Sequence, residues 1–148
     1  MERLPGRRAT VSLVLDSSAT LAWIYGDEIT PAIRTVFERV AEQGAIVPAL
    51  WPLEVANGLT IAMRRGRIDA AFRGAALADL ALLDIATDQS TGSHAWDATL
   101  ALADRFRLTL YDAAYLELAV RRSVPLATLD GALREAAGVL GVELLGGT

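Results

Sequence analysis

The chain contains no cysteine, no lysine and a single histidine, His94. Without cysteine there is no disulfide, no thiolate zinc site and no cysteine nucleophile. Without lysine there is no phosphate-binding P-loop, no Schiff-base chemistry and no complete phosphorylation-receiver site. One histidine cannot form a two-histidine acid–base pair, and no G-x-S-x-G or G-x-G-x-x-G motif indicates a serine hydrolase or a dinucleotide fold. What remains is chemistry based on carboxylates and metal ions, or no chemistry at all.

Long apolar runs are also absent, although 53% of the 148 residues are hydrophobic. No run approaches the ~18 residues that a spanning helix needs. The basic start, MERLPGRRAT, does not continue as a signal peptide, so we expect a cytoplasmic protein with no membrane anchor. The length predicts one domain over residues 11–148, preceded by a flexible leader over residues 1–10. A net charge of −4 argues against general coating of nucleic acid but leaves room for a local arginine patch.

Short apolar runs alternate with helical patterns along the chain. The runs are typical of buried strands and lie at 11–16, 45–48, 84–87, 125–129 and 142–145. Helices are expected at 17–25, 31–43, 51–64, 69–83, 93–105, 111–122 and 131–137. This alternation implies right-handed crossovers and an α/β domain with a mainly parallel sheet of four or five strands.

Four acidic residues lie inside apolar segments, at Asp16, Glu54, Asp112 and Asp130. Charged side chains are rarely buried unless they are paired or bound to a cation. Asp16 and Asp130 follow predicted strands, and the carboxyl ends of parallel strands share one edge of the sheet. Glu54 and Asp112 lie on adjoining helices that reach the same edge. Four carboxylates at one place would repel each other, so we predict a divalent-metal site there.

Each acid taken alone also has a structural explanation. Asp16 and Asp112 could cap the helices that begin beside them, and Asp130 could be an ordinary turn or cap residue. Glu54 is harder to explain in this way, because no local partner is evident for a glutamate among the apolar residues of its helix. The sequence leaves these alternatives open for each residue but makes four coincidences improbable.

Four segments together resemble the PIN domain family, most closely its VapC-like bacterial toxin branch: LDSSATLAW, PLEVANGL, YDAAYLELA and LATLDGALREAAG. The resemblance implies a PIN-like three-layer α/β/α nuclease domain over residues 11–148. It also implies that Mg²⁺ or Mn²⁺ is bound by the catalytic residues Asp16, Glu54, Asp112 and Asp130. Family members of this kind are typically endoribonucleases, often homodimeric, that a small antitoxin protein neutralises.

The chemistry of the four acids agrees with this expectation. Oxygen-only ligands suit Mg²⁺ or Mn²⁺, and a carboxylate-held metal can activate a water for in-line attack on a phosphodiester. We therefore expect a metal-dependent endoribonuclease, the toxin of a toxin–antitoxin pair, whose products carry 5′-phosphate and 3′-hydroxyl ends. Two alternatives remain: an RNA-processing or DNA-acting PIN nuclease, and a non-catalytic module that binds metal for stability alone.

Three polar residues are predicted to support the acids. The Ser17 hydroxyl is expected to bond an acid or a metal-bound water, or else to cap its helix, and Thr128 to bond a neighbouring carboxylate. Asn57, three residues after Glu54, lies on the same helix face and is expected to orient that glutamate or to touch the substrate.

A second group of residues could contact the substrate or a partner. Arg64, Arg65 and Arg67 surround the turn between two helices, where they could steer RNA phosphates or clamp a partner. A solvated helix end that favours cations is the alternative. Asp97 is interpreted as an exposed helical aspartate rather than a fifth ligand. His94 and Trp96 are expected to pack locally rather than stack on a base.

Overall fold

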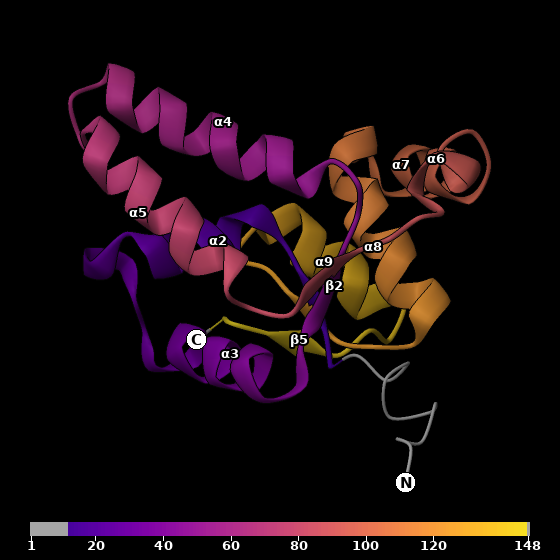
Figure 1. The fold of residues 1–148 in the computed structure, drawn as a ribbon. Coiled ribbons are helices and arrows are strands. Elements are labelled where there is room, and N and C mark those ends of the chain that lie inside the picture. The colour runs from indigo at the N-terminus through magenta and orange to yellow at the C-terminus, as the bar shows by residue number, and fades with distance from the viewer. Residues whose placement is uncertain (1–11, 148) are drawn as a thin grey trace, which may run out of the picture.

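The computed structural model describes residues 12–147, which form a five-stranded sheet with helices on both faces (Figure 1). Its strands are β1 (Val14–Leu15), β2 (Ala45–Val47), β3 (Ile85–Thr87), β4 (Leu126–Ala127) and β5 (Leu144–Leu145). They are ordered β3-β2-β1-β4-β5, and each neighbouring pair is parallel. The predicted α/β class and parallel sheet are confirmed. The predicted leader, residues 1–10, lies outside the described residues.

The helices divide into two groups. The first is α2 (Ser17–Ile24), the 3₁₀ turn η1 (Gly26–Glu28), α3 (Pro31–Gln43), α4 (Trp51–Arg64) and α5 (Ala70–Ala81). The second is α6 (Thr91–His94), α7 (Ala98–Phe106), α8 (Leu110–Arg122) and α9 (Gly131–Val139). Members of each group contact one another, α2 with α3 and α4, and α8 with α7 and α9, so the two groups form the outer layers around the sheet (Figure 1). The predicted three-layer arrangement is therefore confirmed.

The strands are shorter than the apolar runs that predicted them. Proline has no N–H to donate to a ladder, and Pro48 follows β2 while Pro125 precedes β4. Single backbone bonds extend the pairing beyond the strands, from the Val14 N–H to the Pro125 carbonyl (2.8 Å) and from the Asp16 N–H to the Ala127 carbonyl (3.0 Å). The central strand β1 thus stays fixed against β4 up to the residue at its carboxyl end.

The sequence predicted the bounds of α3 correctly but those of the helix expected over 93–105 incorrectly. The Thr30 side chain accepts a hydrogen bond from the Ile33 N–H (3.1 Å), and Gly44 ends α3 with a φ of +80°, as expected of a Thr-Pro start and a glycine stop. The single helix predicted over 93–105 is wrong. It is divided into α6 and α7, because Asp97 has a non-helical backbone (φ −116°, ψ −101°) and is the N-cap of α7.

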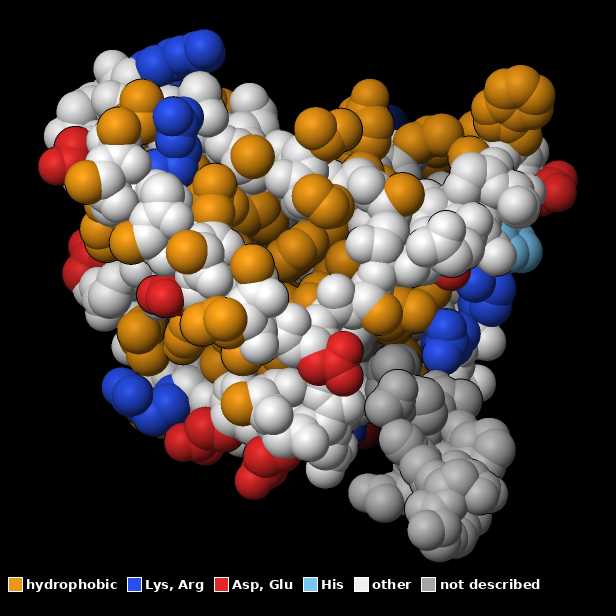
Figure 2. Space-filling model, viewed as in Figure 1, with side chains coloured by type: hydrophobic (Ala, Val, Ile, Leu, Met, Phe, Trp, Pro, Cys, Tyr) orange, Lys and Arg blue, Asp and Glu red, His pale blue; other side chains and the backbone are white. Residues whose placement is uncertain are grey.

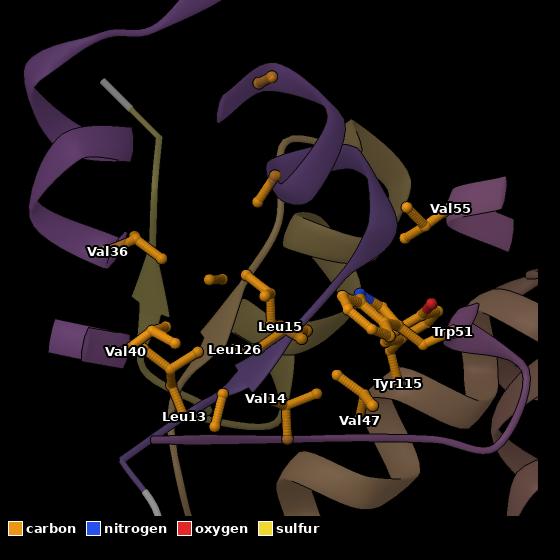
Figure 3. Close-up of a cluster of buried hydrophobic side chains, with 14 of the residues drawn as sticks. Leu13, Val14, Leu15, Val36, Val40, Val47, Trp51, Val55, Tyr115 and Leu126 are labelled. Atoms are coloured by element: carbon orange, nitrogen blue, oxygen red, sulfur yellow. The ribbon is translucent and has the colours of Figure 1, made fainter. Parts of the chain in front are cut away.

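The core is built on both faces of the sheet, which explains why the buried strands β1, β2 and β4 are continuous apolar runs. Leu13, Val14 and Leu15 of the central segment are fully buried against side chains from the surrounding helices and β4 (Figure 3). Trp51 and Tyr115 enter this cluster from α4 and α8, and each large apolar side chain buried in it contributes ~1.5–3 kcal/mol. The core therefore fixes both helices against the carboxyl end of β1.

Two of the three tryptophans pack against other parts of the fold. The Trp23 ring stacks on Phe37 with 4.4 Å between centroids, and the Trp51 Nε1–H donates to the Thr20 hydroxyl (3.1 Å). Trp96, by contrast, is 88% exposed, so the expectation that it packs locally is wrong. Within residues 12–147, no helix combines the length and apolar character needed to cross a bilayer.

Candidate functional site

The four predicted acids lie at the carboxyl edge of the sheet. Asp16 directly follows β1, and Asp130 precedes α9 three residues after β4 ends. Asp112 and Glu54 each lie in the first turn of a helix, α8 and α4 respectively. The pKa of Asp112 is raised to about 6, first by burial and then by the negative charges of the other three acids. The fold therefore brings Asp16, Glu54 and Asp130, from three separate segments, within electrostatic range of Asp112.

Asp16 is the most deeply buried of the four, with 3% of its surface exposed. Its Oδ2 accepts hydrogen bonds from the Thr128 hydroxyl (2.6 Å) and the Ser18 hydroxyl (2.7 Å). Burial raises the pKa of Asp16, and these two bonds oppose that rise by stabilising the ionised form. Thr128 thus bonds a carboxylate, as the sequence predicted, whereas the equivalent contact from Ser18 was not predicted.

Glu54 has partners that come from other elements. Its Oε1 accepts hydrogen bonds from the Tyr115 hydroxyl of α8 (2.7 Å) and from the Ser17 hydroxyl of α2 (3.2 Å). Ser17 also lies 3.5 Å from Oδ1 of Asp16. Glu54 therefore lacks a partner on its own helix but has two partners on other helices. Ser17 contacts two of the acids, while the predicted N-cap position of α2 is occupied by Asp16 instead.

Helix capping explains the position of only one of the four acids. Asp16 lies at the N-cap of α2 but makes no side-chain capping bond. Asp112 is not a cap, because the Thr109 side chain caps α8 by accepting from the Asp112 N–H (3.1 Å). Asp130 does cap α9, since its Oδ2 accepts from the Leu133 N–H (2.9 Å). Capping thus accounts for one carboxylate oxygen of Asp130 and leaves the positions of Asp16, Glu54 and Asp112 without that explanation.

The acids do not form a ready-made metal cage. Within residues 12–147, no three or more Asp, Glu, His or Cys side chains are arranged so that they could hold an ion. The ligand chemistry nevertheless fits a hard divalent cation, because the converging groups are carboxylates and hard cations prefer oxygen ligands.

The predicted substrate-side residues differ in how they are engaged. Asn57, Arg64 and Arg65 are exposed on α4 and just after it. Arg67 instead bonds Glu28 (2.6 Å) and Asp27 (3.4 Å), and its guanidinium lies 4.0 Å from the centre of the Tyr25 ring. The Arg67 side chain therefore connects the α4–α5 turn to η1 through these ion pairs.

A second charged cluster was not predicted. Arg121 donates to both carboxylate oxygens of Asp88 (3.2 and 2.7 Å) and to both of Glu117 (2.7 and 3.0 Å). Burial alone would raise the pKa of Asp88, but hydrogen bonds from Arg121 and its neighbours outweigh burial and leave that pKa lowered. His94 Nδ1 lies 3.9 Å from Glu117, and Asp97 is exposed. His94 and Glu117 therefore belong to a structural cluster that joins α8 to the segment after β3.

Comparison with known proteins gives a family model and several similar structures. Residues 13–139 match the model of the PIN domain, and no curated protein matches the chain. The crystal structure of PAE2754 from Pyrobaculum aerophilum is 23% identical, with a TM-score of 0.66 and coverage of 90% of this chain and 83% of that chain. At this level of identity the likeness shows the shared fold alone.

Two further structures share the fold. FitAcB from Neisseria gonorrhoeae is 13% identical, with a TM-score of 0.61 and coverage of 89% of this chain and 95% of that one. A toxin–antitoxin complex from Klebsiella pneumoniae is 19% identical, with a TM-score of 0.56 and coverage of 88% and 95%. The similarity extends over most of each chain.

Proposed function

Because this chain belongs to the PIN domain family, whose members are commonly nucleases, we propose that it is a metal-dependent endoribonuclease. The ion is Mg²⁺ or Mn²⁺, held by Asp16, Glu54, Asp112 and Asp130. The observation that carries the proposal is that the four acids gather at one edge of the sheet. There the Ser17 hydroxyl lies 3.2 Å from Glu54 and 3.5 Å from Asp16, and the charges of the other three acids raise the pKa of Asp112. Such a concentration of negative charge is favourable once a divalent cation is bound.

Hydrogen bonds hold two of the proposed ligands, Asp16 and Glu54, in place. Two short hydroxyl bonds hold Oδ2 of Asp16, with a longer contact from Ser17 at Oδ1, and two hydroxyl bonds hold Oε1 of Glu54. When bound, a divalent ion supplies an activated water and neutralises charge on the phosphodiester oxygens. His94 is not needed as a general base, and it lies beside Glu117 rather than among the acids.

The exposed arginines of the α4–α5 turn are proposed to bind RNA phosphates. Arg64 and Arg65 lie about ten residues beyond Glu54, which places them ~15 Å farther along the helix direction. Asn57, exposed one turn after Glu54, is proposed to contact the nucleotide nearest the acids. Arg67 is assigned a lesser part in binding, because its guanidinium is already paired with Asp27 and Glu28.

We also propose that the protein is the toxin of a toxin–antitoxin pair. The support is the similarity to the Klebsiella pneumoniae toxin–antitoxin complex. A small antitoxin protein and a second copy of the chain are the proposed partners, and the cytoplasm is the proposed location. Apolar side chains gather in the hollow bordered by α4 and α5 (Figure 2), and Leu53, Ile61, Phe72 and Leu77 are exposed on these helices. Such a surface suits protein association.

The test is cleavage of total cellular RNA by the purified protein with Mn²⁺, with Mg²⁺ and with a chelator. Metal-dependent cleavage that Asp16→Ala and Asp112→Asn abolish, and that the exposed-site control Asp104→Asn retains, is expected. Product ends should be 5′-phosphate and 3′-hydroxyl, so a 2′,3′-cyclic phosphate would overturn hydrolysis by water. Cleavage of single-stranded DNA in preference to RNA would favour the DNA-acting alternative. Metal-induced stabilisation without any cleavage would favour the non-catalytic one.

A further inference from the structure

Tyr115 joins the core of the domain to one of the proposed metal ligands. The residue is fully buried and belongs, with Trp51, to the hydrophobic cluster (Figure 3). Its hydroxyl donates to Oε1 of Glu54 at 2.7 Å, although the two residues are 61 positions apart in the chain. The surrounding core packs against the ring, so the phenol oxygen has a fixed position at the end of a stiff side chain.

A glutamate without such an anchor would have several rotamers. Ordering a free glutamate side chain costs up to ~2 kcal/mol, and this cost reduces metal affinity if it is paid on binding. In the structure, Tyr115 and Ser17 both donate to Oε1 of Glu54. Neither of these two hydroxyls engages the other oxygen, Oε2. The two donors therefore fix which carboxylate oxygen faces the protein and which is left for a ligand.

The same arrangement recurs at the neighbouring acids. Asp16 is held at Oδ2 by Thr128 and Ser18, and Asp130 is held at Oδ2 by the Leu133 N–H. In each case the bonds shorter than 3 Å engage one oxygen of the carboxylate, and Oδ1 of Asp16 has a 3.5 Å contact with Ser17. Second-sphere donors of this type orient ligands, and losing one typically reduces metal affinity or activity 10- to 100-fold.

We propose that Tyr115 is a positioning residue that holds Glu54 in its metal-binding orientation through the phenol hydroxyl. This inference rests on the proposed function, since it requires that Glu54 is a ligand. The competing explanation is that the hydroxyl only satisfies a buried polar group and contributes stability. The two explanations differ in what happens to metal binding when the hydroxyl is removed and the ring is kept.

The experiment compares Tyr115→Phe with the wild type by calorimetric titration of the metal-free protein with Mn²⁺. We expect the Mn²⁺ affinity to fall about 10- to 100-fold, with kcat for RNA reduced and KM little changed. Tyr25→Phe is the matched control, because it removes a phenol hydroxyl from another buried tyrosine, and its Mn²⁺ affinity should equal that of the wild type. Ser17→Ala, which removes the longer bond, should give a smaller loss and serves if Tyr115→Phe does not fold.

A double-mutant cycle decides whether Tyr115 acts through Glu54. Tyr115→Phe should cause no further loss of Mn²⁺ affinity when Glu54→Gln is already present. Wild-type Mn²⁺ affinity in Tyr115→Phe, or equal losses in both backgrounds, would overturn the inference while leaving the proposed function intact. If the wild-type protein neither binds Mn²⁺ nor cleaves RNA, the proposed function fails and the role of Tyr115 fails with it.

Discussion

Replacing Asp112 with asparagine should stabilise the metal-free protein while abolishing its activity. Burial and the charges of three neighbouring acids raise the pKa of Asp112 from 3.8 to about 6. A shift of that size corresponds to at most ~3 kcal/mol of destabilisation at neutral pH. Asp112 is only partly buried, so solvent screening reduces the expected gain to about 1 kcal/mol. In a domain of this length the melting temperature should rise by roughly 2–4 °C.

The dependence on pH follows from the direction of the shift. The folded-state pKa of Asp112 lies above the unfolded value, so the folded protein binds the extra proton between about pH 4 and pH 6. The free energy of unfolding of the metal-free wild type therefore falls as the pH rises through that range. The advantage of Asp112→Asn should be largest at pH 7 and should disappear near pH 4.

Thermal melts in a chelator at pH 4, 5.5 and 7 measure this effect, with Asp104→Asn as the exposed control. Adding Mn²⁺ should reverse the order at pH 7, because an ion that binds only the folded state stabilises the wild type more than the variant that lacks a ligand. If Asp112→Asn is less stable than the wild type in chelator at pH 7, then burial and repulsion among the acids do not control the stability of the metal-free site. The electrostatic basis of the site would then be wrong.

Other substitutions test separate parts of the fold. Thr128→Val removes the 2.6 Å bond to buried Asp16, so urea unfolding should show a loss of about 1–3 kcal/mol. Arg121→Leu removes the arginine partner of two buried carboxylates and should cost about 3 kcal/mol in the same assay; an unchanged midpoint would show that the cluster is dispensable. Arg64→Gln with Arg65→Gln should weaken RNA binding and lower the salt dependence of log Kd by up to about 2. Calorimetry should find their Mn²⁺ affinity unchanged.

The sequence was most informative where a pattern has a local physical cause. Strands buried on both faces must be apolar throughout, so the short runs predicted the parallel sheet. The start and end of α3 were predictable because Thr30, Pro31 and Gly44 act on the backbone next to them. The division between α6 and α7 was missed, since the apolar pattern continues across Asp97 although the backbone there is not helical.

The sequence by itself determined which acids to consider, because charge inside an apolar segment is costly wherever that segment is buried. Only the tertiary structure decided their partners. Tyr115 lies three residues after Asp112, but nothing local indicates that its hydroxyl reaches Glu54, 61 positions away. The same holds for Thr128 and Asp16, which are 112 positions apart. Such contacts depend on how whole helices and strands pack, because a hydrogen bond requires placement within a fraction of an ångström.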